Sequence, residues 1–105
     1  MTRHRLPDQR PSRTVDHTHN FFHGGSQRLL VTVGSDAPGG PPREVFCASF
    51  KAGSDMNAAV QDACVLISRL LQMGVPPGEL AASLSHPPSV VGTLVAVVAE
   101  EAQSE

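Results

Sequence analysis

Aromatic side chains are scarce in this chain of 105 residues, which has four Phe and neither Trp nor Tyr. Its core therefore has to be built mainly from aliphatic side chains. A chain of this length fits one domain and buries only about 60–65% of the surface that the unfolded chain exposes. We expect its stability to be marginal unless a second chain adds to the core.

Cysteines and long apolar runs are also few. The two cysteines, Cys47 and Cys64, form no CxxC motif, and the sequence does not open on an apolar segment typical of a secretion signal. This pattern predicts a cytoplasmic location and two free, buried thiols. The most apolar stretch, residues 90–99, is shorter than the roughly 18 residues that a membrane span needs. We therefore expect no membrane association.

Charge is low overall but uneven along the chain. The formal net charge is −2, which excludes a global field that would draw the whole domain to nucleic acid. Residues 1–13 nevertheless hold four Arg and a single Asp. We predict that residues 1–13 form a flexible basic N-terminal arm, which is either simply solvated or contacts an acidic partner or nucleic acid. Residues 14–103 are predicted to form a single domain.

The first half of that domain has the two-residue period of strands. Residues 14–19 alternate weakly and suit an edge strand, and residues 27–33 place Leu29, Val31 and Val33 on one face. Residues 44–50 are apolar on both faces, which is typical of a strand that is covered on both sides. The short glycine-containing connections between these segments predict an antiparallel β-meander.

The second half has the period of helices. A helix is predicted to begin after Ser54 or Asp55 and to end before Gly74, with short helices over residues 77–84 and 90–101. The predicted fold class is therefore α+β, a two- or three-stranded antiparallel β-meander followed by three helices. In the first helix we expect a core stripe and a solvated polar face, the latter formed by Asn57, Gln61, Ser68 and Gln72.

The third predicted helix is apolar nearly all round, so it is either central to the core or shared with a second chain. Gly92 and Ala96, four residues apart, would let another helix approach closely. We expect a homodimer whose interface is formed by Val91, Leu94, Val95 and Val98.

Three histidines form the one metal-like cluster in the sequence. His17 and His19 would share one face of a strand, and His23 follows nearby. They are interpreted either as a metal site, with Cys47 as a further ligand, or as exposed side chains beside a turn.

Lys51, Gly53 and Ser54 precede the predicted long helix, where backbone N–H groups and the helix dipole favour an anion. They are interpreted either as a ligand or anion site or as a turn in which Ser54 caps the helix.

No arrangement of residue types in the sequence is typical of a catalytic site. Serines and histidines occur without a supporting triad motif, and the Gly-Gly pairs do not match a phosphate-binding loop. We expect no catalytic residues and no cofactor, and we expect that the chain is not an enzyme on its own.

Residues 43–80 resemble a known family pattern: a strand with Glu-hydrophobic-Phe, then Lys-x-Gly-Ser, then a helix that ends in hydrophobic-Gln-x-Gly-Val-Pro. The residues that stand at its positions are Glu44, Val45, Phe46, Lys51, Gly53, Ser54, Ile67, Ser68, Leu71, Gln72, Gly74, Val75 and Pro76. The chain thus resembles a stand-alone TSCPD-domain protein, similar to the C-terminal accessory domain of vitamin B12 (adenosylcobalamin)-dependent ribonucleotide reductases. It departs from that domain by lacking the Thr-Ser-Cys-Pro-Asp segment and any cysteine after Cys64.

The resemblance implies a fold and an ancestry, because the reductase chemistry of that family resides in another domain. It implies a non-catalytic accessory or interaction domain that self-associates or binds a protein partner linked to nucleotide metabolism. The alternative is a small regulatory protein that binds nucleotide or nucleic acid through the basic arm and residues 51–54.

Overall fold

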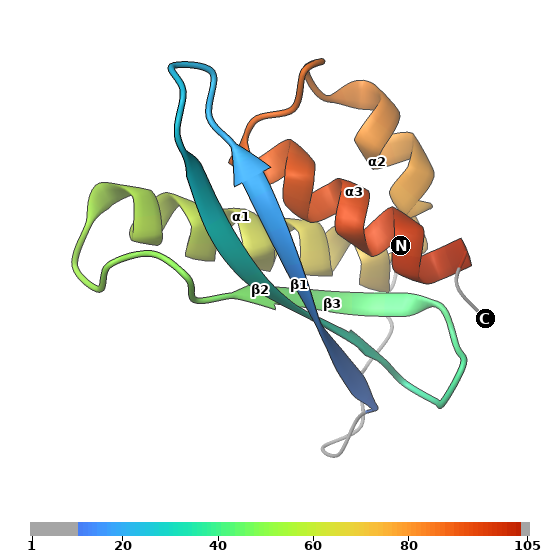
Figure 1. Ribbon diagram of the computed structural model, residues 1–105. Coiled ribbons are helices and arrows are strands. Elements are labelled where there is room, and N and C mark those ends of the chain that lie inside the picture. The colour runs from blue at the N-terminus through green and yellow to red at the C-terminus, as the bar shows by residue number, and fades with distance from the viewer. Residues whose placement is uncertain (1–10, 104–105) are drawn as a thin grey trace.

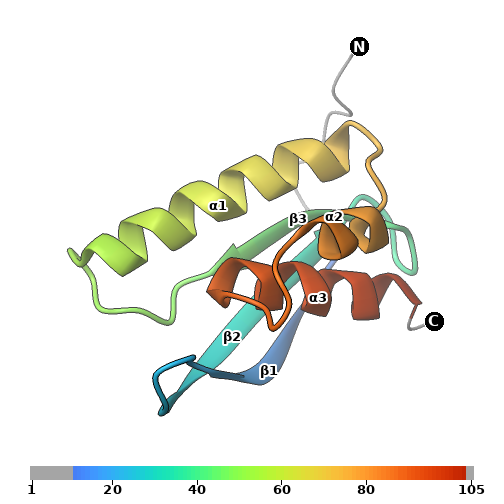
Figure 2. The same ribbon diagram turned by 90° about the horizontal axis from the view of Figure 1, so that it is seen from above.

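A computed structural model describes residues 11–103 and confirms the predicted α+β class. A three-stranded antiparallel sheet is followed by three helices, all on the same side of the sheet (Figure 1 and Figure 2). None of these helices combines the length and apolar character that crossing a membrane requires. The elements are β1 (Ser12–Asn20), β2 (Ser26–Ser35), β3 (Pro42–Cys47), α1 (Asp55–Gln72), α2 (Pro77–Ser83) and α3 (Val90–Gln103).

The sheet is a meander in the order β1-β2-β3, so β1 and β3 are its edge strands. The turn between β1 and β2 contains Gly24 and Gly25 at φ +96° and +80°, a conformation that glycine adopts without steric cost. Val15 pairs with Val31, and Val31 pairs with Cys47. This register aligns alternate residues of all three strands on one face. Strand β1 begins at Ser12, so Ser12 and Arg13 belong to the sheet rather than to the arm; residues 1–10 of the predicted arm lie outside the described residues.

The core lies between the sheet and the helices α1 and α3. Strand β2 contributes Leu29 and Val31, which are wholly buried. The helical spacing of the apolar residues predicts that the core stripe of α1 consists of Met56, Val60, Ala63, Ile67, Leu70 and Leu71. Met56 and Leu70 are instead exposed, while Cys64 is buried as predicted. The stripe is narrow because α1 packs mainly on β3, at the margin of the sheet. Its buried members are Val60, Cys64, Ile67 and Leu71.

The polar side of α1 does not face solvent as predicted, because it lies against the outer edge of β3. Gln72 Nε2 donates a hydrogen bond to the Arg43 carbonyl at 3.2 Å. Ser68 Oγ accepts from Val45 N at 3.0 Å and also contacts the Val45 carbonyl at 3.3 Å. These side chains bond the backbone groups that a fourth strand would otherwise pair, and so they seal this edge of the sheet.

Gln61 completes this seal at the end of β3, where its Nε2 donates to the Cys47 carbonyl at 2.7 Å. Gln61, Ser68 and Gln72 are all half-buried. A polar stripe that looks solvent-facing in the sequence is therefore a set of contacts within the fold.

Helix α3 is central to the core, which corrects the predicted dimer interface. Leu94, Val95 and Val98 are buried within the single chain, and Val91 is half-buried against the same core. The helix contacts all three strands as well as α1 and α2. Gly92 admits a segment of the same chain, since a Cβ there would stand 3.0 Å from the Pro88 Cβ. Leu94, Val95 and Val98 therefore have almost no surface left with which to bind a second copy.

Candidate functional site

The histidines do not gather into the predicted metal cluster. His19 is only 4% exposed, and its Nδ1 lies 2.8 Å from the Thr93 hydroxyl of α3. His23 lies beyond the end of β1, where its ring stacks on the ring of Phe21. The Phe21 ring also packs edge-on against His19. Phe21 thus separates the two imidazoles. Within residues 11–103, no group of three or more His, Cys, Asp or Glu is arranged to hold a metal ion.

Burial governs the titration of His19. Loss of hydration lowers the pKa of His19, and the neighbouring charge of His17 lowers it further. The lowered pKa favours the neutral form of the ring, which links β1 to α3 through the hydrogen bond to Thr93.

Residues 51–54 form a capped turn at the start of α1. Gly53 adopts φ +83°, and Ser54 Oγ accepts a hydrogen bond from Asn57 N at 3.1 Å. The same hydroxyl donates to the Lys51 carbonyl at 2.6 Å, while Lys51 itself is exposed. The hydroxyl of Ser54 is thus already engaged on both sides by the backbone of its own turn.

The two cysteines are free and buried. Burial raises the pKa of the Cys64 thiol to about 11, and the nearby Cys47 contributes to the rise. Cys47 Sγ lies 3.5 Å from the Ser49 hydroxyl. A thiol with so high a pKa stays protonated at neutral pH and is a poor nucleophile.

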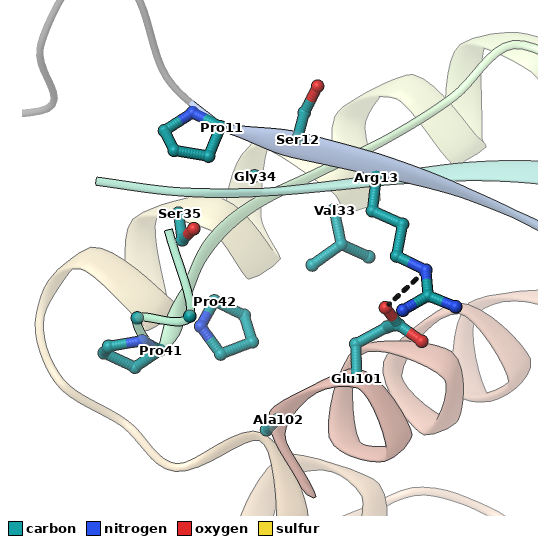
Figure 3. Close-up of a pocket in the computed structure, with 12 residues that line it drawn as sticks. Pro11, Ser12, Arg13, Val33, Gly34, Ser35, Pro41, Pro42, Glu101 and Ala102 are labelled. Carbon is teal, nitrogen blue, oxygen red and sulfur yellow. Dashed lines mark ion pairs between the residues drawn. The ribbon is translucent and has the colours of Figure 1, made fainter. Parts of the chain in front are cut away.

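A cavity of about 470 Å³ lies at one end of the sheet (Figure 3). The Arg13 guanidinium reaches across it to Glu101 of α3, with 3.5 Å between Nε and Oε1. These two side chains, which carry opposite charges, are the only ionisable groups in the described lining, and half of that lining is proline and glycine. The sequence does not reveal this cavity, because its lining comes from four separate segments, residues 11–13, 33–35, 39–42 and 101–102.

The face of the sheet that points away from the helices is a second candidate surface. Leu30 and Phe46 lie on it at 47% and 53% exposure, Leu30 in the middle of β2 and Phe46 next to the last residue of β3. The sequence predicts that the strand containing Phe46 is covered on both sides, but among residues 11–103 helices cover one side only. A shallow hollow of about 410 Å³ marks this face, lined by Thr14, Arg28, Leu30, Thr32, Phe46, Ala48 and Ser49.

The polar groups of the uncovered face bond one another. The hydroxyls of Thr14 and Thr32, which are cross-strand partners, lie 3.0 Å apart. Arg28 Nε donates to both carboxylate oxygens of Asp16, at 2.9 and 2.8 Å. This hydrogen bonding lowers the pKa of Asp16. The face therefore presents apolar side chains among polar groups that already have partners.

Phe46 also borders a groove of about 340 Å³ between β3 and α1. The exposed Val65 of α1 lines the far side of this groove. An apolar strip therefore runs from Leu30 across Phe46 to Val65, past the edge of β3 to which Ser68 and Gln72 are hydrogen-bonded. From here on, the term uncovered face includes both the hollow on the outer side of the sheet and this strip.

These features define a small α+β domain in which helices cover one side of a three-stranded meander and an apolar strip crosses the other. The family model of the TSCPD domain matches residues 2–99, and the chain belongs to this family. No curated protein and no solved structure matches the chain.

The predicted membership of the TSCPD family is thereby confirmed, and the fold gives several of the motif positions a physical role. Ser68 and Gln72 bond the outer edge of β3, and Gly53 and Gly74 adopt positive φ at the two ends of α1. Phe46, another motif position, lies on the uncovered face.

Proposed function

We propose that this chain is a non-catalytic interaction domain that binds protein through its uncovered face. The observation that carries the proposal is the half-exposure of Leu30 and Phe46 beside polar groups that already have partners. Covering such a face removes apolar area from water and leaves few polar groups newly unpaired. Apolar, aromatic centres with a polar rim are typical of protein-binding surfaces.

The motif that resembles the accessory domain of vitamin B12-dependent ribonucleotide reductases supports a partner of that kind. The partner class that we propose is a reductase chain, to which this domain supplies binding rather than chemistry. The high pKa of Cys64 and the engagement of Ser54 by its own turn argue against a nucleophilic role for either side chain.

A binding titration tests this proposal. The labelled chain, at nanomolar concentration, is titrated with a vitamin B12-dependent reductase chain from which the C-terminal domain has been removed, and fluorescence anisotropy is recorded. Saturable binding is expected, and Phe46→Lys should weaken it about tenfold or more, because a charge would enter the apolar centre of the contact. Leu66→Lys is the matched control, since Leu66 is 63% exposed on the outer side of α1. Equal affinities for the wild type and Phe46→Lys would contradict the proposal.

The same titration separates the proposal from binding of nucleotide or nucleic acid through residues 51–54 and the basic arm. Contacts to phosphate weaken steeply as salt rises, whereas apolar association does not. We expect reductase binding to change little with salt. Binding of a nucleotide that Lys51→Ala abolishes, with no reductase binding, would favour the alternative.

A further inference from the structure

The outward side of α1 carries a second apolar stripe besides the one that enters the core. Its members follow one another at intervals of three, four, three, four and three residues, and all are exposed except the half-buried Ala63. This alternation is the spacing of a helix that packs along its length against one other helix. The stripe, which we call the seam, consists of Met56, Ala59, Ala63, Leu66, Leu70 and the C-cap residue Met73.

We propose that two copies of this chain pair through their seams, with the two α1 helices antiparallel about a two-fold axis. Figure 2 shows α1 along the margin of the molecule, with α2 and α3 to one side of it only. The seam shares no residue with the uncovered face. The pairing therefore leaves Leu30 and Phe46 available to another protein.

The order of large and small side chains makes the seam complementary to its own reverse. The antiparallel pairing sets Ala59 against Leu70 of the other copy and Ala63 against Leu66, while the methionines at the two ends meet each other. A small side chain opposite a large one at each central contact lets the helices approach closely without gaps. In a parallel pairing each alanine would face the same alanine, and the space between them would stay unfilled.

The charges beside the seam favour the same pairing. Asp62 and Arg69 are exposed on the flank that faces solvent, because Val60 and Ile67 on the other flank are buried in the core. Within residues 11–103, the side chains of Asp62 and Arg69 take part in no hydrogen bond or ion pair. The antiparallel pairing brings Asp62 of each copy beside Arg69 of the other, whereas a parallel pairing gives neither an opposite charge. Such complementarity selects both the partner and its orientation.

These two matches commit the seam to a second copy of this chain. Any other helix would need apolar residues in the complementary order and charges at the matching positions, and this chain already carries both. Every match occurs twice across the two-fold axis, so one sequence supplies the whole interface. One helix from each copy makes a small interface. We therefore expect pairing at roughly tens of micromolar chain and monomers at the nanomolar concentration of the anisotropy titration.

Sedimentation velocity at rising micromolar concentrations tests the dimer. The wild type should shift from monomer to dimer, and Leu66→Lys, which places a charge in the middle of the seam, should remain a monomer. Phe46→Lys is the matched control, since it adds the same charge at an exposed residue outside the seam, and it should dimerise like the wild type. Thermal unfolding at low micromolar concentration verifies that each variant is folded. A monomeric wild type, or a dimer that Phe46→Lys abolishes and Leu66→Lys does not, would overturn the inference.

An exchange of charges tests the antiparallel orientation. Asp62→Arg makes positions 62 and 69 both basic, and Arg69→Asp makes both acidic. Each variant alone should dimerise several-fold more weakly than the wild type at low salt, because like charges then meet across the interface. An equimolar mixture of the two variants should dimerise like the wild type. A mixture that associates no better than the separate variants would overturn the orientation.

The dimer and the proposed function are tested separately by the same two variants. Leu66→Lys should abolish the dimer and leave reductase binding unchanged, whereas Phe46→Lys should do the reverse. A wild type that is monomeric but binds the reductase chain overturns the dimer and leaves the proposed function standing. A dimer lost in Leu66→Lys, together with reductase binding that Phe46→Lys does not alter, supports the dimer and overturns the proposed function.

Discussion

Hydrogen bonds from single side chains fix how the layers of this domain meet. Gln61, Ser68 and Gln72 join α1 to the edge of β3, and His19 joins β1 to Thr93 of α3. The residue types that make these bonds are visible in the sequence. Their partners are not, because they are backbone groups and hydroxyls whose positions depend on how distant segments pack.

Replacing Gln61 should lower the free energy of unfolding by more than replacing a solvent-exposed polar residue of a helix would. Gln61→Ala removes the bond to the Cys47 carbonyl and should lower the free energy of unfolding by about 1 kcal/mol. Asp62→Ala, an exposed neighbour, should change it by less than about 0.5 kcal/mol. Urea denaturation of both variants measures the difference. Indistinguishable midpoints would show that Gln61 does not hold the edge of β3.

The free energy of unfolding should fall as the pH is lowered, because His19 is protonated more readily in the unfolded state. Its pKa is lowered in the folded state, so the unfolded state takes up the proton more readily. The contribution of neutral His19 to stability is therefore complete when the pH is above 6.5, the ordinary pKa of histidine. This contribution is lost as the pH falls from there through the lowered pKa of the folded state. His19→Asn should flatten the fall in unfolding free energy between about pH 7 and about pH 5, whereas His23→Asn, at an exposed site, should leave it steep. A steep fall that persists in His19→Asn would exclude this source.

Secondary-structure elements were largely predictable from the period of their apolar residues. The meander, the caps of α1 and the helical character of α3 all follow from local patterns, because turn glycines and capping residues act over short distances. The exact stripe of α1 was not predictable. Its period allows Met56 and Leu70 into the core, but the position of α1 at the margin of the sheet leaves both exposed.

Two adjacent positions of α1 test this placement. Ile67 is buried in the core and Leu66 is largely exposed. Ile67→Ala should destabilise the fold by about 2–5 kcal/mol, because it opens a cavity among aliphatic side chains. Leu66→Ala should cost less than about 0.5 kcal/mol. Thermal or urea unfolding gives both values, and similar losses at the two positions would mean that the faces of α1 are wrongly assigned.

At the scale of the whole fold, residues 11–103 form a single sheet that helices cover on one side and leave uncovered on the other. The sequence indicates that α3 is either central or shared, and only the assembled fold decides that it is central. The uncovered face and the cavity beside Arg13 and Glu101 escape sequence reasoning for the same reason. Each is formed by segments that lie far apart along the chain.

Because α3 lies at the centre of the core, a charged side chain introduced into its buried face should destabilise the fold. Val98 is wholly buried, and Val98→Lys would place an ammonium group in the core without a counter-ion. We expect this variant to be unfolded or to lose several kcal/mol of stability. Circular dichroism during thermal unfolding measures the effect. A stable Val98→Lys variant that has only lost a partner would instead restore α3 as an interface.

The central claim is that the uncovered face is where this domain binds protein, and amide chemical shifts test it most directly. The isotopically labelled chain is observed by NMR before and after addition of the reductase chain. The account predicts that the changes cluster at Leu30, Thr32 and Phe46 and spare residues 51–54 and 90–98. Changes confined to residues 51–54 or to α3, with none at Leu30 or Phe46, would contradict it.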